Sequence, residues 1–198
     1  MSPRTPVPRP KPSGAALPDE IFAGFAGAPM QARNAPGPLT EERARAVLAT
    51  VPDPEIPSVM LPDLGVIRGV EVTGDAVTVR MSPTYTGCPA TDLMQMMIRE
   101  QLTATGFASV TVDLVLSPPW SSDDITAEGR RKMAAAGIAP PAHRATDKRH
   151  LTGTLPDVAC PHCGSADTVM TSAFGATACK ALWRCNACQE PFDYFKCI

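Results

Sequence analysis

Two cysteine pairs near the end of the chain have the spacing of metal-binding turns. Cys160 and Cys163 form one Cys-x-x-Cys pair, Cys185 and Cys188 form a second, and 21 residues separate the pairs. Each such turn places two thiolates on one side of a metal ion, and two turns complete a tetrahedron. The spacing predicts a four-cysteine zinc site, with an iron–sulfur cluster or a redox-active dithiol pair as the alternatives.

The segment that carries these cysteines, residues 155–198, contains few large apolar side chains. Burial alone supplies too little free energy to fold so short a segment, and a bound metal would supply the rest. We therefore expect a zinc ribbon with structural zinc, in which His162 lies at the surface because four thiolates already satisfy the ion. Cys179 and Cys197 are spare thiols, for which burial, metal ligation and sulfur exchange all stay open.

The charge of the chain argues against nucleic acid as a partner. Residues 155–198 hold three basic and four acidic side chains, a net charge of −1, and the whole chain holds 18 basic and 20 acidic ones. A ribbon with this balance gains little from counterion release on phosphate. We expect the ribbon to contact protein, and salt-sensitive binding would reveal the rival, a nucleic-acid-binding regulator.

A further thiol, Cys88, lies in the first half of the chain just before a predicted helix. Backbone N–H groups at a helix N-terminus favour anions, so a thiolate there could be a metal or cluster ligand, or a nucleophile. All three histidines lie at residue 143 or beyond, which argues against a Cys–His enzyme. A half-buried structural cysteine is the plain alternative.

Asp53 and Glu55 place two carboxylates in a loop that three prolines stiffen. They could complete a metal site with Cys88, or they could accept hydrogen bonds from nearby backbone amides. Trp120 could be an exposed anchor for a protein partner, or it could pack on the edge of a sheet.

The elements that must position these residues form an α+β domain over residues 39–141. Thr40 caps a first helix, two alternating apolar runs flank a turn at 73–75, and a second helix runs from about Pro89 to Gly106. A third strand and a helix over about 124–136 complete the order helix, strand, strand, helix, strand, helix. We expect the second helix to bury a stripe made of Leu93, Met96, Met97 and Leu102.

The remaining segments and the composition set the class of protein. Residues 1–38 hold nine of the 22 prolines, which predicts a disordered arm, and residues 142–154 have the polar composition of a linker. The sequence shows no signal-peptide pattern, no apolar run long enough for a membrane helix, and an odd number of cysteines. We expect a cytoplasmic protein with reduced thiols and no membrane partner.

Several motifs resemble known families. Residues 53–57, 63–67 and 83–89 read DPEIP, DLGVI and PTYTGCP, and they resemble the small α+β domain family of iron–sulfur protein maturation. The tail, SAFGATACKAL at 172–182 and EPFDYFK at 190–196, resembles the D (or J) subunits of the bacterial phenylacetyl-CoA ring epoxidase system. The resemblance covers residues 40–198 and assigns nothing to the proline-rich arm.

The resemblance implies a role in aerobic phenylacetate degradation, with the oxygenase and reductase subunits of the epoxidase as partners. The sequence lacks a Glu-x-x-His pair for a di-iron site and a nucleotide-binding glycine loop. We therefore expect an accessory, non-catalytic subunit of this monooxygenase system, which helps to assemble or insert an iron or iron–sulfur centre. Cys88 would be the transfer ligand, with Asp53 and Glu55 shaping its site. A stable structural subunit and a general iron–sulfur assembly factor are the alternatives, and a homodimer stays open.

Overall fold

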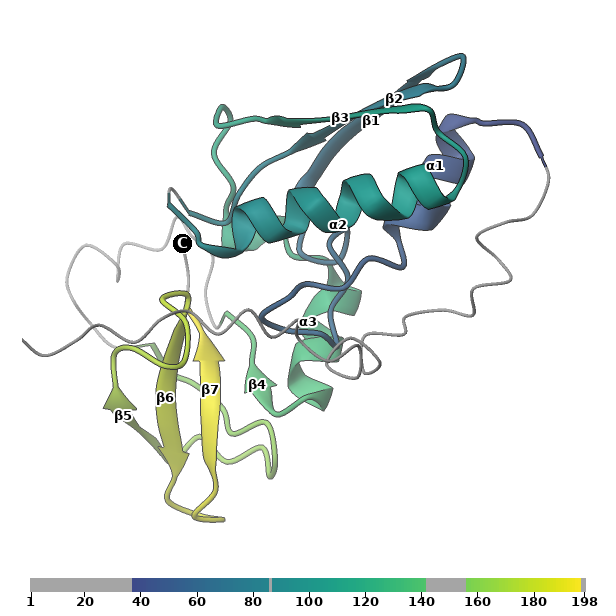
Figure 1. The fold of residues 1–198 in the computed structure, drawn as a ribbon. Helices are drawn as coiled ribbons and strands as arrows, with labels where there is room; N and C mark the ends of the chain where they lie inside the picture. The colour runs from purple at the N-terminus through teal and green to yellow at the C-terminus, as the bar shows by residue number, and fades with distance from the viewer. Residues whose placement is uncertain (1–36, 86, 142–155, 197–198) are drawn as a thin grey trace, which may run out of the picture.

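The computed structural model describes residues 37–85, 87–141 and 156–196. The arm predicted at 1–38 and the linker predicted at 142–154 lie almost wholly outside the described residues, as does Cys197. Two sheets and three α-helices confirm the α+β class (Figure 1). None of the described helices combines the length and the apolar composition that crossing a bilayer would need.

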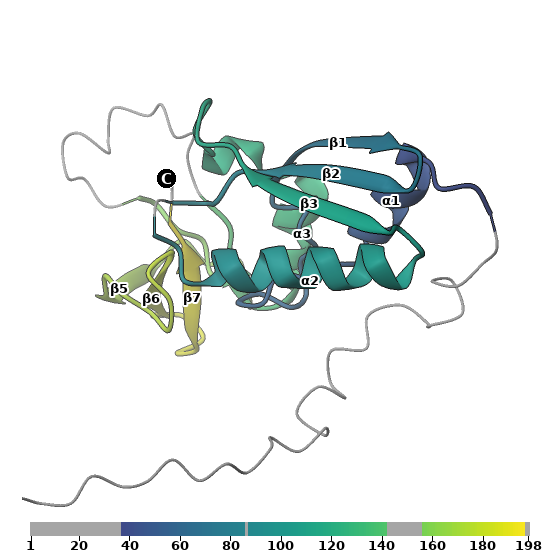
Figure 2. The ribbon, with the colours of Figure 1, turned by 45° about the horizontal axis from the view of Figure 1, so that its top comes forward.

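The first sheet follows from the predicted hairpin. Strands β1 (Ile67–Thr73) and β2 (Ala76–Met81) are antiparallel, and β3 (Ser109–Leu114) runs parallel to β2. A parallel neighbour needs a crossover connection, which helix α2 (Ala90–Ala104) supplies. Both views place α2 alongside the sheet (Figures 1 and 2). Helix α1 (Glu41–Leu48) packs against α2.

The predicted buried stripe of α2 is wrong for two of its four residues. Leu93 and Met96 are 41% and 56% exposed, whereas Met97 is partly buried and Leu102 is fully buried. The helix carries apolar residues on two neighbouring faces, so the helical period alone does not decide which face meets the sheet. The buried residues of α2 are spaced four apart: Ala90, Met94, Ile98 and Leu102.

The last helix of the first domain begins later than the sequence suggested. Residues Ser122–Asp124 form a short 3₁₀ turn (η4), and Thr126 then caps helix α3 (Ala127–Ala135) by accepting a hydrogen bond from Gly129 N. Two caps in succession divide what the sequence pattern presents as one helix.

The second sheet has the order β4-β7-β6-β5, with β5 (Thr168–Ser172), β6 (Lys180–Cys185) and β7 (Pro191–Phe195) from the ribbon. Its edge strand β4 (Ile138–Ala139) follows α3 directly and pairs in parallel with β7. Figure 1 shows this sheet beside α3, below the three-stranded sheet. The chain segment after α3 therefore ties the ribbon to the first domain.

Trp120 joins the two parts of the fold. Its side chain is buried, its Nε1 donates a hydrogen bond to the Leu64 carbonyl oxygen at 2.8 Å, and its ring meets that of Phe195 edge-on at 6.2 Å. Phe195 and Cys179 of the ribbon belong to the buried cluster of the first domain. Of the two expectations for Trp120, the exposed anchor is wrong, because the side chain is buried against Leu64 and against Phe195 of strand β7.

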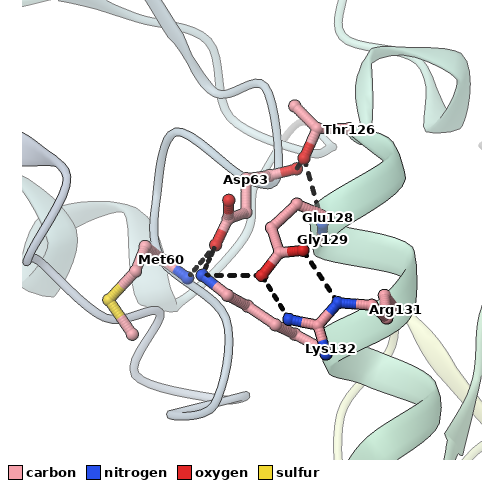
Figure 3. A network of polar contacts seen from close by, with 7 residues as sticks. All are labelled: Met60, Asp63, Thr126, Glu128, Gly129, Arg131 and Lys132. Atoms are coloured by element: carbon pink, nitrogen blue, oxygen red, sulfur yellow. Dashed lines mark hydrogen bonds and ion pairs between the residues drawn. The ribbon is translucent and has the colours of Figure 1, made fainter.

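A second anchor holds α3 against the loop before β1 (Figure 3). The Asp63 carboxylate lies 2.6 Å from Lys132 Nζ, and the Asp63 carbonyl oxygen accepts hydrogen bonds from the backbone N–H and the hydroxyl of Thr126. The same loop carries Leu64, which holds the Trp120 indole. This network therefore fixes the surface on which the ribbon packs.

A double-mutant cycle tests whether the ring contact between Trp120 and Phe195 stabilises the fold. Trp120→Leu and Phe195→Leu should each lower the free energy of unfolding by about 2–3 kcal/mol, because each removes buried aromatic volume. The double variant should lose about 1 kcal/mol less than the sum of the two single losses, because an edge-to-face pair is usually worth about that much. Urea unfolding of the four proteins measures this coupling, and strictly additive losses would show that the two rings do not interact.

Candidate functional site

Four sulfur atoms meet in the ribbon. Cys160 and Cys163 lie before β5, Cys185 ends β6, and Cys188 lies in the turn that leads to β7. All four sulfur atoms lie within 4.8 Å of one another, with 3.7 Å from Cys160 to Cys188 and 3.6 Å from Cys163 to Cys185. Metal–sulfur bonds of about 2.3 Å in a tetrahedron place sulfur atoms about 3.8 Å apart. The donor set therefore fits one tetrahedral ion that prefers thiolates.

The two cysteine turns have the same backbone form. Gly164 and Gln189, which follow the second cysteine of each pair, have positive φ angles of 76° and 66°. The first cysteine of each pair donates its N–H to the carbonyl oxygen five residues later, at 2.9 Å from Cys160 and 3.0 Å from Cys185. Two equivalent turns that face each other supply all four ligands of a tetrahedral ion, as in structural metal sites.

The backbone around Cys185 favours its thiolate. Hydrogen bonds from the N–H groups of Cys188 and Ala187 lower the pKa of Cys185 to about 7. A metal ion binds the thiolate and not the thiol, so these N–H groups prepare the side chain for ligation. His162, by contrast, is exposed and is not part of the donor set, as the sequence suggested.

The first domain holds a second, different group of donors around Cys88. This cysteine precedes α2, whose first turn has no side-chain cap, and it is 8% exposed. Its thiol is hydrogen-bonded to the side chain of Tyr85. Burial raises the pKa of Tyr85 to about 12, and interaction with Cys88 adds to the shift. The phenol therefore keeps its proton at neutral pH and can donate it in a hydrogen bond to a thiolate.

Asp53 is a buried carboxylate that shapes the neighbouring loop. Its Oδ1 accepts hydrogen bonds from Glu55 N at 2.9 Å and Ile56 N at 2.8 Å. Burial raises its pKa to about 6, although these two hydrogen bonds act in the opposite direction. In the structure Asp53 thus accepts hydrogen bonds from nearby backbone amides, which is one of the two alternatives that the sequence left open.

Glu55 reaches the ribbon. The Cys179 thiol lies 3.4 Å from Glu55 Oε2 and 3.0 Å from Thr177 Oγ1. Burial raises the pKa of Cys179 to about 11, so the free protein carries this thiol in its protonated form. Next to it, the buried Lys180 forms an ion pair with Asp193 at 3.0 Å, and its charge also acts on Asp53.

A pocket of about 250 Å³ opens beside the Cys88 loop. Residues 82–85 form one wall, and Leu116, Pro119 and Trp120 form the other. The wall that carries Tyr85 is the start of the segment that ends at Cys88. The thiol site and the pocket thus share one loop.

The structure brings two of the predicted site residues together and places Tyr85, which the sequence analysis did not single out, near them. Asp53 and Glu55 share a hydrogen bond, and Glu55 and Cys88 both act electrostatically on Tyr85. Tyr85 stands within a motif already quoted, three residues before Cys88. Cys179 was left open as a spare thiol, because nothing in one sequence shows that residue 179 lies against residue 55.

Asp53→Asn should remove a pH dependence of stability. The folded-state pKa of about 6 exceeds the value of about 3.9 for an unfolded chain, so the contribution of Asp53 to stability is largest at low pH and is lost as the pH rises through 6. Asparagine still accepts both backbone hydrogen bonds but carries no charge. Between pH 5 and pH 7 the wild type should lose about 1 kcal/mol more than the variant. Urea unfolding at both pH values measures the difference, and equal losses would refute the effect of burial.

Comparisons with known proteins match both parts of the chain. Residues 41–115 match the family model described as "Iron-sulfur cluster assembly protein", and residues 144–196 match that of the "PaaD zinc beta ribbon domain". The D subunit of a "Putative 1,2-phenylacetyl-CoA epoxidase" from Escherichia coli strain K12 is 47% identical over 153 residues, which cover 77% of this chain and 90% of that protein.

A shorter relative and two solved structures match the first domain. The "Fe-S protein maturation auxiliary factor" of Porphyromonas gingivalis is 41% identical over 96 residues, 48% of this chain and 90% of that protein. A crystal structure of a domain of unknown function from Bacillus anthracis has a TM-score of 0.44 at 24% identity, covering 47% of this chain and 90% of that one. A conserved hypothetical protein from Thermotoga maritima has a TM-score of 0.43 at 26% identity, covering 48% and 95%.

Proposed function

From the premise that the chain belongs to the family of the phenylacetyl-CoA epoxidase D subunits, with an iron–sulfur assembly domain and a zinc ribbon, we propose that it is an accessory maturation subunit. It helps to assemble or insert an iron or iron–sulfur centre in the oxygenase or the reductase of the epoxidase. Activation of oxygen and epoxidation belong to those partner subunits. The chain works in the cytoplasm, where its thiols stay reduced.

The contrast between the two thiol sites carries this proposal. The ribbon site is closed by four cysteines from two equivalent turns, which suits a permanent ion. The Cys88 site combines thiol, phenol and carboxylate groups beside a pocket. A site that supplies fewer than four protein ligands leaves positions of a metal centre open to ligands from another protein, and a carrier must release its cargo. We assign structural zinc to the first site and transient iron or iron–sulfur binding to the second.

In this proposal Cys88 is the ligand that passes the metal centre on, and Asp53 and Glu55 shape its site. The described hydrogen bonds give Asp53 the task of holding Glu55, since its Oδ1 accepts from Glu55 N. The ribbon recognises the client protein, because its charge does not favour nucleic acid. Structural zinc would be held by Cys160, Cys163, Cys185 and Cys188.

Complementation of a deletion strain tests the proposal. We expect the wild-type gene to restore growth on phenylacetate, and the Cys88→Ser variant to leave the oxygenase or reductase short of iron and growth at least tenfold slower. Normal growth of the deletion strain would refute the pathway assignment. Full activity of Cys88→Ser, with the subunit co-purifying in stoichiometric amounts, would favour a purely structural subunit. Loss of unrelated iron–sulfur enzymes in the deletion strain would favour a general assembly factor.

A further inference from the structure

We propose that strand β3 is the interface of a homodimer, in which the β3 strands of two copies pair antiparallel about a two-fold axis. The three-stranded sheets of the two copies then join into one continuous sheet, in the order β1-β2-β3-β3-β2-β1. The inference goes beyond the proposed function, because it concerns the assembly of the chain and involves no metal centre.

Strand β3 has one neighbour among the strands that the structure describes. The sheet order β1-β2-β3 places β2 on one side of it, and Figure 2 shows β3 at the margin of the sheet. A strand in this position presents a row of unpaired N–H and C=O groups along its outer side. Those groups can bond to the backbone of a further strand.

The ladder with β2 uses every second residue of β3. Ser109 N donates a hydrogen bond to the Asp75 carbonyl oxygen at 3.4 Å. Six residues later, Val115 N donates to the Met81 carbonyl oxygen at 2.8 Å. Because the bonded residues alternate along such a ladder, the backbone groups of the residues between them point away from β2. These outward-pointing residues are Val110, Val112 and Leu114.

The other edge strands of the two described sheets carry features that hinder pairing. Strand β1 has a bulge between Ile67 and Gly69, β5 has one between Met170 and Ser172, and β4 is two residues long. Strand β3 pairs with β2 in unbroken register over Ser109–Leu114 and contains no proline and no lysine. Bulges, short length, proline and lysine are the usual protections of an edge strand. The edge of β3 lacks all four and is therefore suited to pairing.

The side chains of β3 define the strand that this edge accepts. Val112 is buried, Val110 is half-buried, and Leu114 is 46% exposed on the same face of the strand. A strand paired here must place apolar residues beside these three and polar residues on the opposite, solvent-facing side. Strand β3 has this alternation itself, since its other residues are polar and exposed: Ser109, Thr111 and Asp113. A second copy of β3 therefore fits the edge.

An axis through Val112 gives the longest overlap without opposed charges. Val112 then faces Val112 of the second copy, and Val110 faces Leu114. These are pairs of outward-pointing residues, and such pairs exchange two hydrogen bonds each in an antiparallel ladder. Asp113 faces Thr111 in this register, whereas an axis one residue later would set Asp113 against Asp113, which is unfavourable.

This pairing closes the assembly at two copies. A two-fold axis builds the interface from the same surface of both copies, so each β3 edge is used once. The outer strands of the combined sheet are then the two β1 strands, whose bulges hinder further pairing. We expect a dimer and no larger species.

Sedimentation equilibrium of the full-length, zinc-loaded protein tests the inference. We expect the wild type to form a dimer that dissociates on dilution. Leu114→Lys places a charge at the pairing edge, on a side chain exposed enough to leave the fold intact, and should raise the dissociation constant at least tenfold. Leu182→Lys is the matched control, because Leu182 is 40% exposed on the inner strand β6 of the other sheet. It should dimerise as the wild type does.

Amide hydrogen exchange locates the interface without a variant. The N–H groups of Val110, Val112 and Leu114 should exchange at least tenfold more slowly in concentrated than in dilute protein, because they gain partners only in the dimer. The N–H groups of Thr111 and Asp113, which bond to β2, should exchange slowly in both.

Three results would each overturn the inference: a wild type that stays monomeric, a dimer that Leu114→Lys leaves unchanged, and fast exchange of the three outward N–H groups in the dimer. Protection of these groups only after the oxygenase or reductase is added would assign the edge to a strand of that partner and would also overturn the homodimer. None of these results bears on the role of Cys88, so the proposed function would stand.

Discussion

Cys185→Ser should remove the metal from the ribbon and unfold residues 156–196. Cys185 is fully buried, and its sulfur lies in short contact with that of Cys163 and accepts a hydrogen bond from Cys188 N. Binding of zinc to four thiolates supplies about 10–16 kcal/mol to small metal-dependent domains, more than a typical domain has in reserve. Zinc should fall from about one per chain to near zero. The fluorescence of Trp183, which packs against Tyr194 in the ribbon core, should shift to the red.

Cys88→Ser is the matched control for this experiment, because it removes a buried thiol outside the ribbon site. It should retain one zinc per chain and the native fluorescence of Trp183. Folded, metal-free Cys185→Ser would contradict the claim that the metal supplies the folding energy of the ribbon. Iron in place of zinc in the purified wild type would contradict the identity of the ion.

Gly65→Ala should lower the free energy of unfolding by at least about 3 kcal/mol, because it combines backbone strain with a clash against a fixed backbone atom. Gly65 has a φ angle of +69°, and a Cβ there would clash with the Asp124 carbonyl oxygen. The neighbouring loop is held by Asp63 and Lys132, so it has little room to move away.

Gly74→Ala isolates the contact from the strain. Gly74 has nearly the same φ angle, +62°, in the hairpin turn, but no atom lies within 4 Å of its would-be Cβ. Gly74→Ala should lower the free energy of unfolding by only about 1 kcal/mol, because a residue with a Cβ is strained by about that much in the left-handed conformation. Thermal unfolding of the two variants measures the difference. Equal losses of unfolding free energy in the two variants would show that the loop before β1 moves away from Asp124 and accommodates the added methyl group.

Local signals were sufficient for the features that depend on neighbouring residues. Thr40 accepts the hydrogen bond from Arg43 N that an N-cap should accept, and the turn at Gly74 joins the two predicted strands. The grouping of the four ribbon cysteines into one metal site also followed from their spacing, since a Cys-x-x-Cys turn is itself a local structure. In each case the signal and the structure that it predicts lie within a few residues.

Features that depend on distant residues could not be predicted in this way. The indole of Trp120 is held by a carbonyl 56 residues earlier, and Cys179 meets a carboxylate 124 residues away. Strand β4 contains only two residues and exists because β7 lies beside it. The exposed Leu93 belongs to the same class, because the sheet and not the helix decides which face is buried.

Zinc, iron and sulfide per chain, measured on protein isolated without oxygen, decide whether this chain carries a metal centre besides the ion of the ribbon. We expect about one zinc per chain in both the wild type and Cys88→Ser. We also expect substoichiometric iron with thiolate-to-iron absorption in the wild type and its loss in Cys88→Ser. One zinc and no iron in either protein, with no iron bound after reconstitution, would contradict the claim that this chain carries a metal centre.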